Sequence, residues 1–308
     1  MKANIMNLQR FAGENNYMGI KTYSPQFIGL LQAVFESRAY FSDFFVGNTV
    51  EALDGIGNKK AFSLKVCDIP VAVGSTYDTG AAKAFGAGTE NTTRWGNRTE
   101  IKYTDEDVDY TWEWTMHEGI DRATVNYDFD DAVADRLELH ARAKVNKFNQ
   151  QHGKFISASA GTTVTTSAAT LTEADVAKVF NEINKAFTDA EVVGTKVAKV
   201  SPDFYNLIVD SSLAVTSKGS SVNIDENGIV KFKGFQIQEV PSSLFQTGEV
   251  CYAYVTEVAK AFTGIDTVRT FEAEGFNGVA LQGAGKAGEY IPAANKKAVA
   301  KVKLKAAA

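Results

Sequence analysis

One stretch of the chain, FDDAVADRLELHARAKVNKFNQQH at residues 129–152, decides how the rest can be arranged. It lies in a run of 33 residues, between Gly119 and Gly153, that contains neither glycine nor proline. Apolar side chains recur in it every three or four positions, at Phe129, Val133, Leu137, Ala141, Val145 and Phe148. This spacing predicts one long helix with a single apolar face. Unbroken, the run would measure ~50 Å at ~1.5 Å per residue, so we expect a spine whose charged faces meet water or other subunits.

The segment from Lys59 to Lys102, before this helix, has the pattern of a long hairpin. Two stretches that alternate apolar and polar residues, Phe62–Val66 and Thr99–Tyr103, flank a middle rich in glycine, alanine, serine and threonine. That middle has little side-chain mass to bury and much backbone freedom to lose. We expect a hairpin that extends to a neighbouring subunit. A plain surface loop or two-stranded flap is the alternative.

The N-terminal part divides at Ser24-Pro25, a pair typical of a helix start. The residues that follow carry one apolar stripe at helical spacing, formed by Phe27, Leu30, Leu31, Val34 and Phe35. The stripe leads into an aromatic patch at Phe41, Phe44 and Phe45. Because the first 23 residues show no such pattern, we interpret them as an arm that becomes ordered only against another surface.

The C-terminal half has the alternating pattern of an α/β domain. A Ser/Thr-rich stretch, Ser157–Thr170, is typical of a flexible connection and a domain boundary. Thr170 and Glu173 have capping-box spacing before an amphipathic helix, and a hairpin is predicted to turn at Gly234. We predict a strand at Val250–Val255, a short helix at Thr256–Phe262 and an extended segment at 267–281. The chain then ends in a basic tail with Lys296, Lys297, Lys301, Lys303 and Lys305.

Composition excludes several classes of protein. With 308 residues and 44% hydrophobic residues, the chain has enough apolar material for one large core or two smaller ones. A net charge of −5 gives no global attraction to nucleic acid or an anionic membrane. Cys67 and Cys251 are the two cysteines, too few for a disulfide framework. No run is long and apolar enough to span a membrane, and the start lacks a signal peptide, so we expect a soluble protein made in the cytoplasm.

The motifs that could form a catalytic or binding site lack the neighbouring residues that such sites require. Gly283–Gly288 has the G-x-G-x-x-G spacing of a dinucleotide site, but no helix and no suitably placed acidic residue follow it. His117, His140 and His152 are spaced too far apart to share a helix face as metal ligands. We expect His140 on the polar side of the spine and His152 at its C-terminal end. We therefore predict no catalytic, cofactor-binding or metal-binding residues and no cofactor, hence no enzyme.

Two acidic clusters are best explained as charged surfaces. Neither has the spacing of a calcium loop, and we expect both to face water or another subunit. Trp112 and Trp114 alternate with polar residues, which predicts a strand with one buried aromatic face. The clusters comprise Asp105, Glu106, Asp107 and Asp109, and Asp128, Asp130, Asp131 and Asp135.

This order of parts resembles the major capsid protein of tailed bacteriophages, which has the Hong Kong 97-type fold. Three short strings also resemble such coat proteins: MNLQRFA at 6–12, GFQIQEVP at 234–241 and FEAEGF at 271–276. The resemblance implies an α+β fold in five parts. These are an N-terminal arm and helix (1–50), an extended E-loop hairpin (59–103), a P-domain with the spine helix (104–165), an α/β A-domain (166–262), and a P-domain return with the C-terminal tail (263–308).

The resemblance also implies a function. Identical subunits would form the hexamers and pentamers of an icosahedral phage head that encloses double-stranded DNA, so the protein would be assembled in the host bacterial cytoplasm and reside in the virion. A separate scaffolding protein and a portal are expected partners, and a membrane is not. The basic tail would either contact packaged DNA non-specifically or solubilise a frayed terminus.

Some members of the family cross-link a loop lysine to a P-domain asparagine. Lys83, Asn277 and Asn295 have the corresponding positions, but no surrounding motif supports a cross-link, and we expect none. Three alternatives to a phage head remain: an encapsulin-like nanocompartment with the same fold, a soluble two-domain enzyme with a cleft near 157–170, and a secreted adhesion module.

Overall fold

The computed structural model describes residues 38–53, 58–67, 69, 71, 73–75, 77–80, 94–95, 99–125, 129–211, 223–225 and 228–306. The predicted arm, the helix after Pro25, most of the glycine-rich hairpin tip with Lys83, and most of the loop at 216–228 lie outside these residues. The described residues form two compact units. One comprises Leu53–Tyr110, and the other combines the residues up to Ala52 with those from Thr111 onward.

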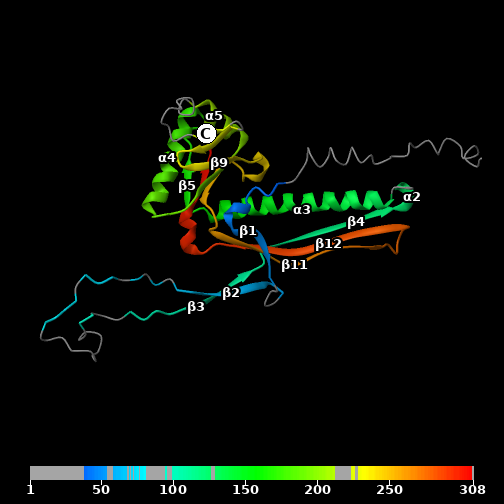
Figure 1. Cartoon of the computed structure of the whole chain (residues 1–308), viewed down its shortest axis with the longest axis horizontal. Helices are drawn as coiled ribbons and strands as arrows, with labels where there is room; N and C mark the ends of the chain where they lie inside the picture. Colours follow the sequence, from blue (N-terminus) through cyan, green and yellow to red (C-terminus); the bar gives the residue numbers. More distant parts are fainter. Residues whose placement is uncertain are drawn as a thin grey trace, which may run out of the picture. The chain divides into compact units, whose positions relative to one another are not determined.

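A four-stranded sheet in the larger unit has the order β1-β11-β12-β4 (Figure 1). The long strands β11 and β12 form an antiparallel pair, β4 pairs antiparallel with β12, and β1 pairs parallel with β11. The bounds are Phe45–Ala52 for β1, Trp112–Asp121 for β4, Ala259–Glu272 for β11 and Gly278–Tyr290 for β12. The predicted strand with Trp112 and Trp114 on one face is β4; Trp114 is buried and Trp112 is partly buried.

Helix α3, Phe129–Ser159, is the predicted spine and lies along β4, β12 and β11 (Figure 1). It follows a short helix, α2, at Arg122–Val125. Asp130 and Asp131 occupy its first turn, where negative charge favours a helix N-terminus. The predicted end of the helix at His152 is wrong, because α3 continues through Gly153 for about two more turns, which contain the buried Ile156. His152 is therefore a buried residue of the helix interior.

The second sheet of this unit has seven strands in the order β5-β13-β10-β6-β9-β8-β7. Lys233 and Gly234 have positive φ angles of 46° and 88° and form the predicted turn between β8 and β9. The bounds are Thr162–Thr165 for β5, Lys196–Val200 for β6, Asn223–Asp225 for β7, Gly228–Phe232 for β8, Phe235–Glu239 for β9, Glu249–Val255 for β10 and Val299–Lys303 for β13.

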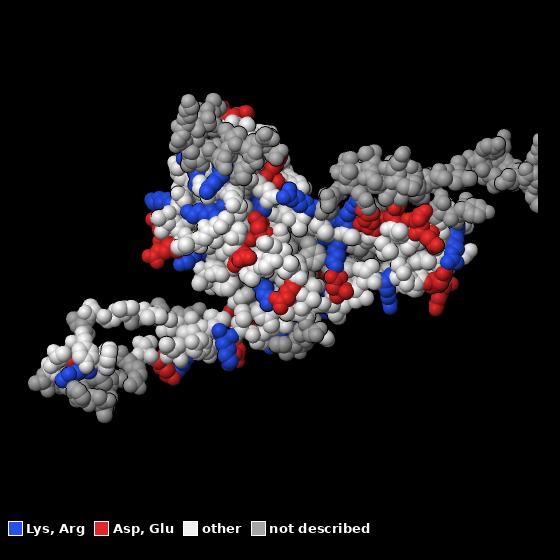
Figure 2. All heavy atoms as spheres, in the orientation of Figure 1, with Lys and Arg blue, Asp and Glu red and all other residues white. Residues whose placement is uncertain are grey.

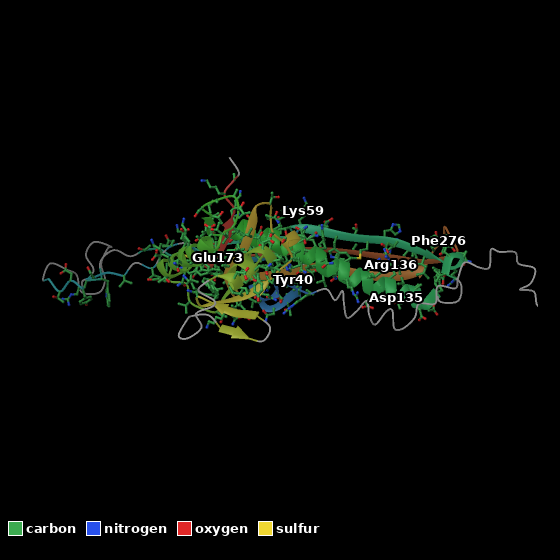
Figure 3. The ribbon with its side chains drawn as sticks, turned by 90° about the horizontal axis from the view of Figure 1, so that it is seen from above. Tyr40, Lys59, Asp135, Arg136, Glu173 and Phe276 are labelled. Atoms are coloured by element: carbon green, nitrogen blue, oxygen red, sulfur yellow. The ribbon has the colours of Figure 1, made fainter. Side chains whose placement is uncertain are left out.

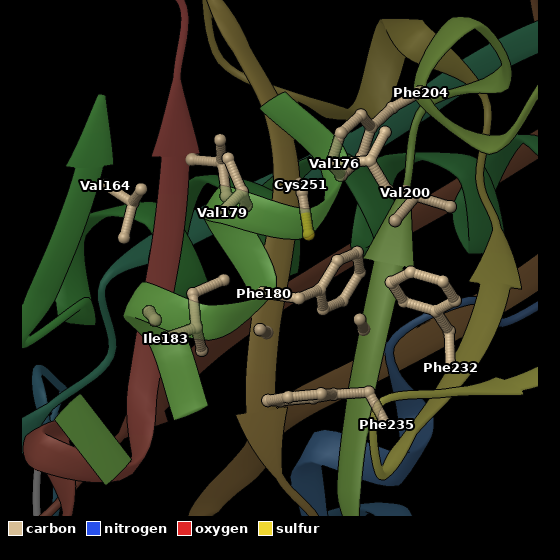
Figure 4. Packing of buried hydrophobic residues seen from close by; sticks show 14 of the residues in the cluster. Val164, Val176, Val179, Phe180, Ile183, Val200, Phe204, Phe232, Phe235 and Cys251 are labelled. Atoms are coloured by element: carbon tan, nitrogen blue, oxygen red, sulfur yellow. The ribbon is translucent and has the colours of Figure 1, made fainter. Parts of the chain in front are cut away.

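Apolar side chains cover both faces of the seven-stranded sheet. On one face, α4 (Glu173–Asp189) and α5 (Pro202–Asp210) pack around Phe180, which contacts the rings of Phe204, Phe232 and Phe235 (Figure 4). On the other face, the predicted aromatic patch and the last turns of α3 cover Tyr252 and Tyr254. Phe41, Phe44 and Phe45 are each at most 1% exposed. The sheet is thus an inner layer between two apolar clusters.

Several predicted boundaries are wrong. The segment Thr256–Phe262 is not a helix, because Glu257 adopts a φ of 60° in a turn that leads directly into β11. The capping box of α4 is formed by Thr172 and Asp175, two residues later than predicted. The Ser/Thr-rich stretch contains β5, an edge strand of the sheet, so it is not wholly a flexible connection. Short 3-10 helices occupy Ser42–Phe44 (η3), Ser242–Leu244 (η5) and Ala293–Ala298 (η6).

The basic tail is also different from the prediction. Residues 299–303 form β13, which lies between β5 and β10 inside the sheet. Lys301 forms an ion pair with Glu249 at 2.9 Å and donates to the Ser157 hydroxyl at 3.2 Å. This part of the tail is therefore not frayed, because its backbone completes two strand ladders.

The smaller unit contains the antiparallel pair β2 (Lys60–Val66) and β3 (Thr104–Asp109). The predicted second strand at 99–103 is displaced into the acidic run that follows it. Lys60 pairs with Asp107 at 2.5 Å and Lys65 with Asp105 at 3.1 Å. Ion pairs between facing strands select the acidic partner, because opposite charges on paired positions stabilise a sheet.

Gly153 allows α3 to pass close to the chain near η5. A Cβ atom at this position would lie 2.4 Å from the carbonyl oxygen of Leu244. Alanine normally stabilises a helix interior relative to glycine by ~1 kcal/mol, but here the backbone would have to move apart. We expect Gly153→Ala to destabilise the fold by about 1–3 kcal/mol, as measured by thermal unfolding.

Gly275→Ala is the matched control, since a Cβ at Gly275 would meet no heavy atom within 4 Å. It should leave the free energy of unfolding nearly unchanged. A Gly153→Ala variant as stable as the native chain would contradict the close approach of α3 to η5.

Candidate assembly surfaces

The first half of α3 is held on the four-stranded sheet by ion pairs. Arg136 and His140 both donate to Glu118 of β4, with His140 Nε2 at 2.7 Å from the carboxylate. Hydrogen bonds from Arg136 first, and from His140, lower the pKa of Glu118 to about 2. His140 is buried and bonded to β4, and not on an open polar face. One turn further along, Lys144 forms an ion pair with Asp266 of β11.

Trp114 fills the space between the sheet and α3. The Lys144 ammonium group lies 4.7 Å from the centre of its ring. A Cβ atom at Gly285 would lie 2.4 Å from Trp114 Nε1, and one at Gly283 would lie 3.0 Å from the ring. The Gly283–Gly288 motif thus lies in the middle of β12, where two of its glycines make room for a tryptophan.

The outer surface of α3 is acidic at its N-terminal end. Burial, together with the charges of Glu138 and Asp131, raises the pKa of Asp135. Acidic side chains gather over the part of the molecule where α3 begins (Figure 2). Asp135 is next to Arg136 on the helix (both labelled in Figure 3), and Arg136 is already used by Glu118. Among the described residues of the cluster, Asp135 is therefore the one whose charged form is disfavoured in the single chain.

The face of the four-stranded sheet that points away from Trp114 is mainly polar within this unit. Because side chains alternate along a strand, it carries the Glu113–Lys286 ion pair, at 3.3 Å, and the contact between Arg269 and Gln282. Phe276, in the connection between β11 and β12, lies against Gly119 and is still 37% exposed (labelled in Figure 3). A polar surface with a few exposed apolar side chains is typical of non-obligate protein interfaces.

Several large apolar side chains of the small hairpin unit are highly exposed. Val71 and Val73 are 89% and 91% exposed, and Trp95 is 84% exposed. Ile101 and Tyr103, which precede β3, are more than half exposed. A strand was predicted at 99–103, but these residues lie outside the ladder, because β3 begins at Thr104. These side chains are available for contact with another surface.

Buried charged groups fix the aromatic patch to the seven-stranded sheet. Lys199 of β6 is 1% exposed, and its ammonium group lies 2.9 Å from Asp43. The Tyr254 hydroxyl donates to the other oxygen of Asp43 at 2.8 Å. Burial lowers the pKa of Lys199, while Asp43 opposes this effect. Sequence reasoning missed this site, although a lysine within the apolar strand VAKV is a signal of a paired buried cation.

A second buried titratable pair lies where α3, β12 and β4 meet. Glu289 accepts hydrogen bonds from Trp112 Nε1 at 3.0 Å and Thr111 Oγ1 at 3.3 Å, and burial raises its pKa to about 7. His152 Nε2 is 3.5 Å away, between the rings of Phe45 and Phe148, and burial lowers its pKa to about 3. Glu289 and His152 are therefore both uncharged between about pH 3 and pH 7.

Among the described residues, no three histidine, cysteine, aspartate or glutamate side chains are grouped so that they could hold a metal ion. Within the same part of the chain, none of the helices combines the length and the apolar character that a membrane crossing requires. The three histidines are not brought together: His140 and His152 lie on α3 with different partners, and His117 is on β4.

Comparison with known proteins supports the fold. No family model matches the chain, and no curated protein matches it in sequence. A chain in the capsid structure of cyanophage P-SCSP1u has a TM-score of 0.65 at 11% identity, covering 89% of this chain and 90% of its own. A chain in the mature capsid of bacteriophage PhiM1 has a TM-score of 0.62 at 13% identity, covering 88% and 87%. A chain from Mycobacterium phage Che8 has a TM-score of 0.60 at 16% identity, covering 80% and 84%.

These similarities concern the fold. The chain has the α+β fold of phage capsid chains, so the predicted resemblance to the Hong Kong 97-type capsid fold is confirmed. The division into five parts remains a prediction.

The contribution of Glu289 to stability should fall with rising pH, whereas that of His152, whose pKa is lowered from 6.5 to about 3, rises up to about pH 6.5. The pKa of Glu289 is raised from the ordinary value of 4.5 to about 7, so the folded chain keeps a proton that the unfolded chain has already lost in this window. This carboxyl therefore disfavours the folded state progressively from pH 4.5 to pH 7. We expect Glu289→Gln to be more stable than the native chain by on the order of 2–3 kcal/mol at pH 8, and nearly equal at pH 4.5.

Thermal unfolding across this pH range measures the difference, with Glu51→Gln as a control at a carboxylate that is 53% exposed. The control should follow the native pH profile. Equal pH slopes for the native chain and Glu289→Gln would contradict the buried, raised-pKa carboxyl.

Proposed function

We propose that this protein is the structural major capsid subunit of a tailed-phage head. Copies of the chain assemble into hexamers and pentamers of an icosahedral shell around double-stranded DNA. The observation that carries the proposal is the hairpin of the smaller unit, whose Val71 and Val73 are about nine-tenths exposed, on a chain with the fold of phage capsid chains. The proposed role is mechanical, with no catalytic residues and no cofactor.

The energetics of the hairpin favour an intermolecular role. A two-stranded hairpin is at best marginally stable alone in water, and β2–β3 is the only ladder among the described residues of this unit. Full burial of one valine contributes roughly 1.5–3 kcal/mol. Burial of Val71, Val73 and Trp95 on a neighbouring copy would therefore supply the stability that the isolated hairpin lacks.

The charge distribution supports contacts with protein partners and with packaged DNA. An acidic cluster on α3 is relieved if a basic group of a neighbouring subunit or of a separate scaffolding protein approaches it. Lys296, Lys297 and Lys303 are exposed and available for non-specific contact with packaged DNA, whereas Lys301 is engaged by Glu249. A portal and a scaffolding protein complete the proposed set of partners. Assembly takes place in the host bacterial cytoplasm, and the product is part of the virion.

An encapsulin-like nanocompartment is the second candidate, because it would use the same fold and the same self-assembly. The two functions differ in what the shell encloses. A soluble enzyme is less favoured, since the buried titratable groups, Glu289 and Lys199, are occupied by structural partners.

Expression of the chain, alone and together with its neighbouring reading frames, tests the proposal. We expect closed shells or ring-shaped capsomers in negative-stain electron microscopy and a matching early peak in size-exclusion chromatography. Nuclease-protected double-stranded DNA in the particles identifies a phage head, whereas enclosed protein identifies a nanocompartment. A monodisperse monomer or dimer in every context would overturn the shell function.

The hairpin valines provide a sharper test. The double variant Val71→Ser/Val73→Ser removes apolar surface that is bare in the single chain, so the melting temperature of the subunit should stay within a few degrees of the native value. Assembly should fall at least about tenfold, because each lost valine contact weakens several neighbouring contacts of a closed shell. Light scattering and counts of particles on micrographs measure the yield.

Val193→Ser is the matched control, since Val193 is 90% exposed but belongs to the larger unit. It should assemble at the native yield. Normal particles from the hairpin double variant would show that these valines do not form the intersubunit contact.

A further inference from the structure

A groove with a volume of about 410 Å³ lies between α3 and the start of β1, within the larger unit. Its floor is apolar and is formed by Phe45, Val50, Ala141, Val145 and Phe148. The α3 residues that line it run from Ala141 to His152, about 17 Å at 1.5 Å per residue. An apolar groove of this length is suited to one face of a short helix.

The backbone of β1 opens this groove. Phe45 pairs with Ala259 and Val50 with Ala261, so the strand uses five residues where β11 uses two. Gly47 and Asn48 have φ angles of 73° and 54°, which turn the chain out of the ladder. The bulge leaves the apolar side of α3 uncovered by β1 along this stretch.

Residues 38–40 lie at the edge of the groove and are held by Asn149. The Asn149 amide donates from Nδ2 to the carbonyl oxygen of Arg38 at 2.7 Å and accepts from the backbone N–H of Tyr40 at 3.1 Å. Ala39, between them, lines the groove. Asn149 is 2% exposed, so this is a fixed anchor for the preceding segment. Phe35 is four residues from Ala39 and can lie at most ~14 Å from it.

The preceding segment has the chemistry that the groove requires. Residues 25–35 contain no charged side chain, and their apolar residues recur at helical spacing. Leu31 and Val34 are in the stripe, while Glu36 falls on the opposite side of a helix with 3.6 residues per turn. As a helix, residues 25–37 would measure ~20 Å, close to the length of the groove.

We propose that the apolar stripe of residues 25–37 docks in the groove between α3 and β1 of the same chain. Because Asn149 holds residues 38–40 at the groove, we favour docking of the segment from the same chain over docking from a second copy. A segment attached a few residues away is present at an effective concentration in the millimolar range, which a segment from a second copy reaches only in a dense assembly. Docking covers Phe148 and Val145 and joins the N-terminal part of the chain to the spine helix.

Hydrogen exchange on the full-length chain, kept dilute and unassembled, tests the proposal. We expect the amides of residues 25–37 to exchange at least about tenfold more slowly than those of residues 1–20. Val145→Asp places a charge in the groove and should abolish this protection without changing the segment itself. Leu31→Ser should also abolish it, whereas Glu36→Ala on the opposite side should keep it.

Val145→Asp could disturb the fold of the larger unit, and native exchange in α4 checks for this. Leu31→Ser changes the docking segment and leaves α3 intact, so it tests the proposal independently. A disulfide between Leu31→Cys or Val34→Cys and Val145→Cys, in a Cys67→Ser background, should form within one chain. Absent protection, protection unaffected by Val145→Asp, or disulfides that form only between chains would each overturn the proposal.

Discussion

The rest of the structure depends on one rigid element, the 31-residue helix α3, being packed against two different sheets. Its first half lies on the four-stranded sheet, held through Glu118 and Lys144. Its last turns enter the apolar cluster on the seven-stranded sheet, where Ile156 is fully buried and Gly153 permits close contact. A helix of this length spans ~46 Å. Movement of one sheet relative to the other must therefore disturb the packing of α3.

The buried polar groups have a different role from the apolar clusters. Burial of aromatic and aliphatic side chains supplies most of the stability, while a buried ion pair offsets its own desolvation only when its geometry is good. Lys199 with Asp43, and Glu249 with Lys301, join segments that are far apart in the sequence. These ion pairs favour the contact of η3 with β6 and of β13 with β10. The proposed role in a shell would use this combination of a rigid centre and a hairpin with exposed apolar residues.

Patterns that repeat every few residues predicted secondary structure that the fold contains. The spine helix, the turn at Gly234 and the β4 strand are confirmed. The candidate surfaces were only partly predictable. The acidic run at 104–109 became a strand because lysines on β2 face it, and residues 299–303 became an inner strand because β5 and β10 lie on either side. Neither partner is a local neighbour in the sequence.

The sequence by itself determined the long helix and the turn at Gly234, because helical periodicity and glycine conformations act over a few residues, and its resemblance to phage capsid proteins implied the α+β class. Only the tertiary structure decided that α3 continues past Gly153, that Gly283 and Gly285 accommodate Trp114, and that Glu289 is a buried acid with a raised pKa. These features depend on desolvation and on contacts between residues far apart in the sequence, such as Gly153 with Leu244 and Trp112 with Glu289. No local pattern encodes such distances, since the free energy of a buried group is set by the atoms that surround it.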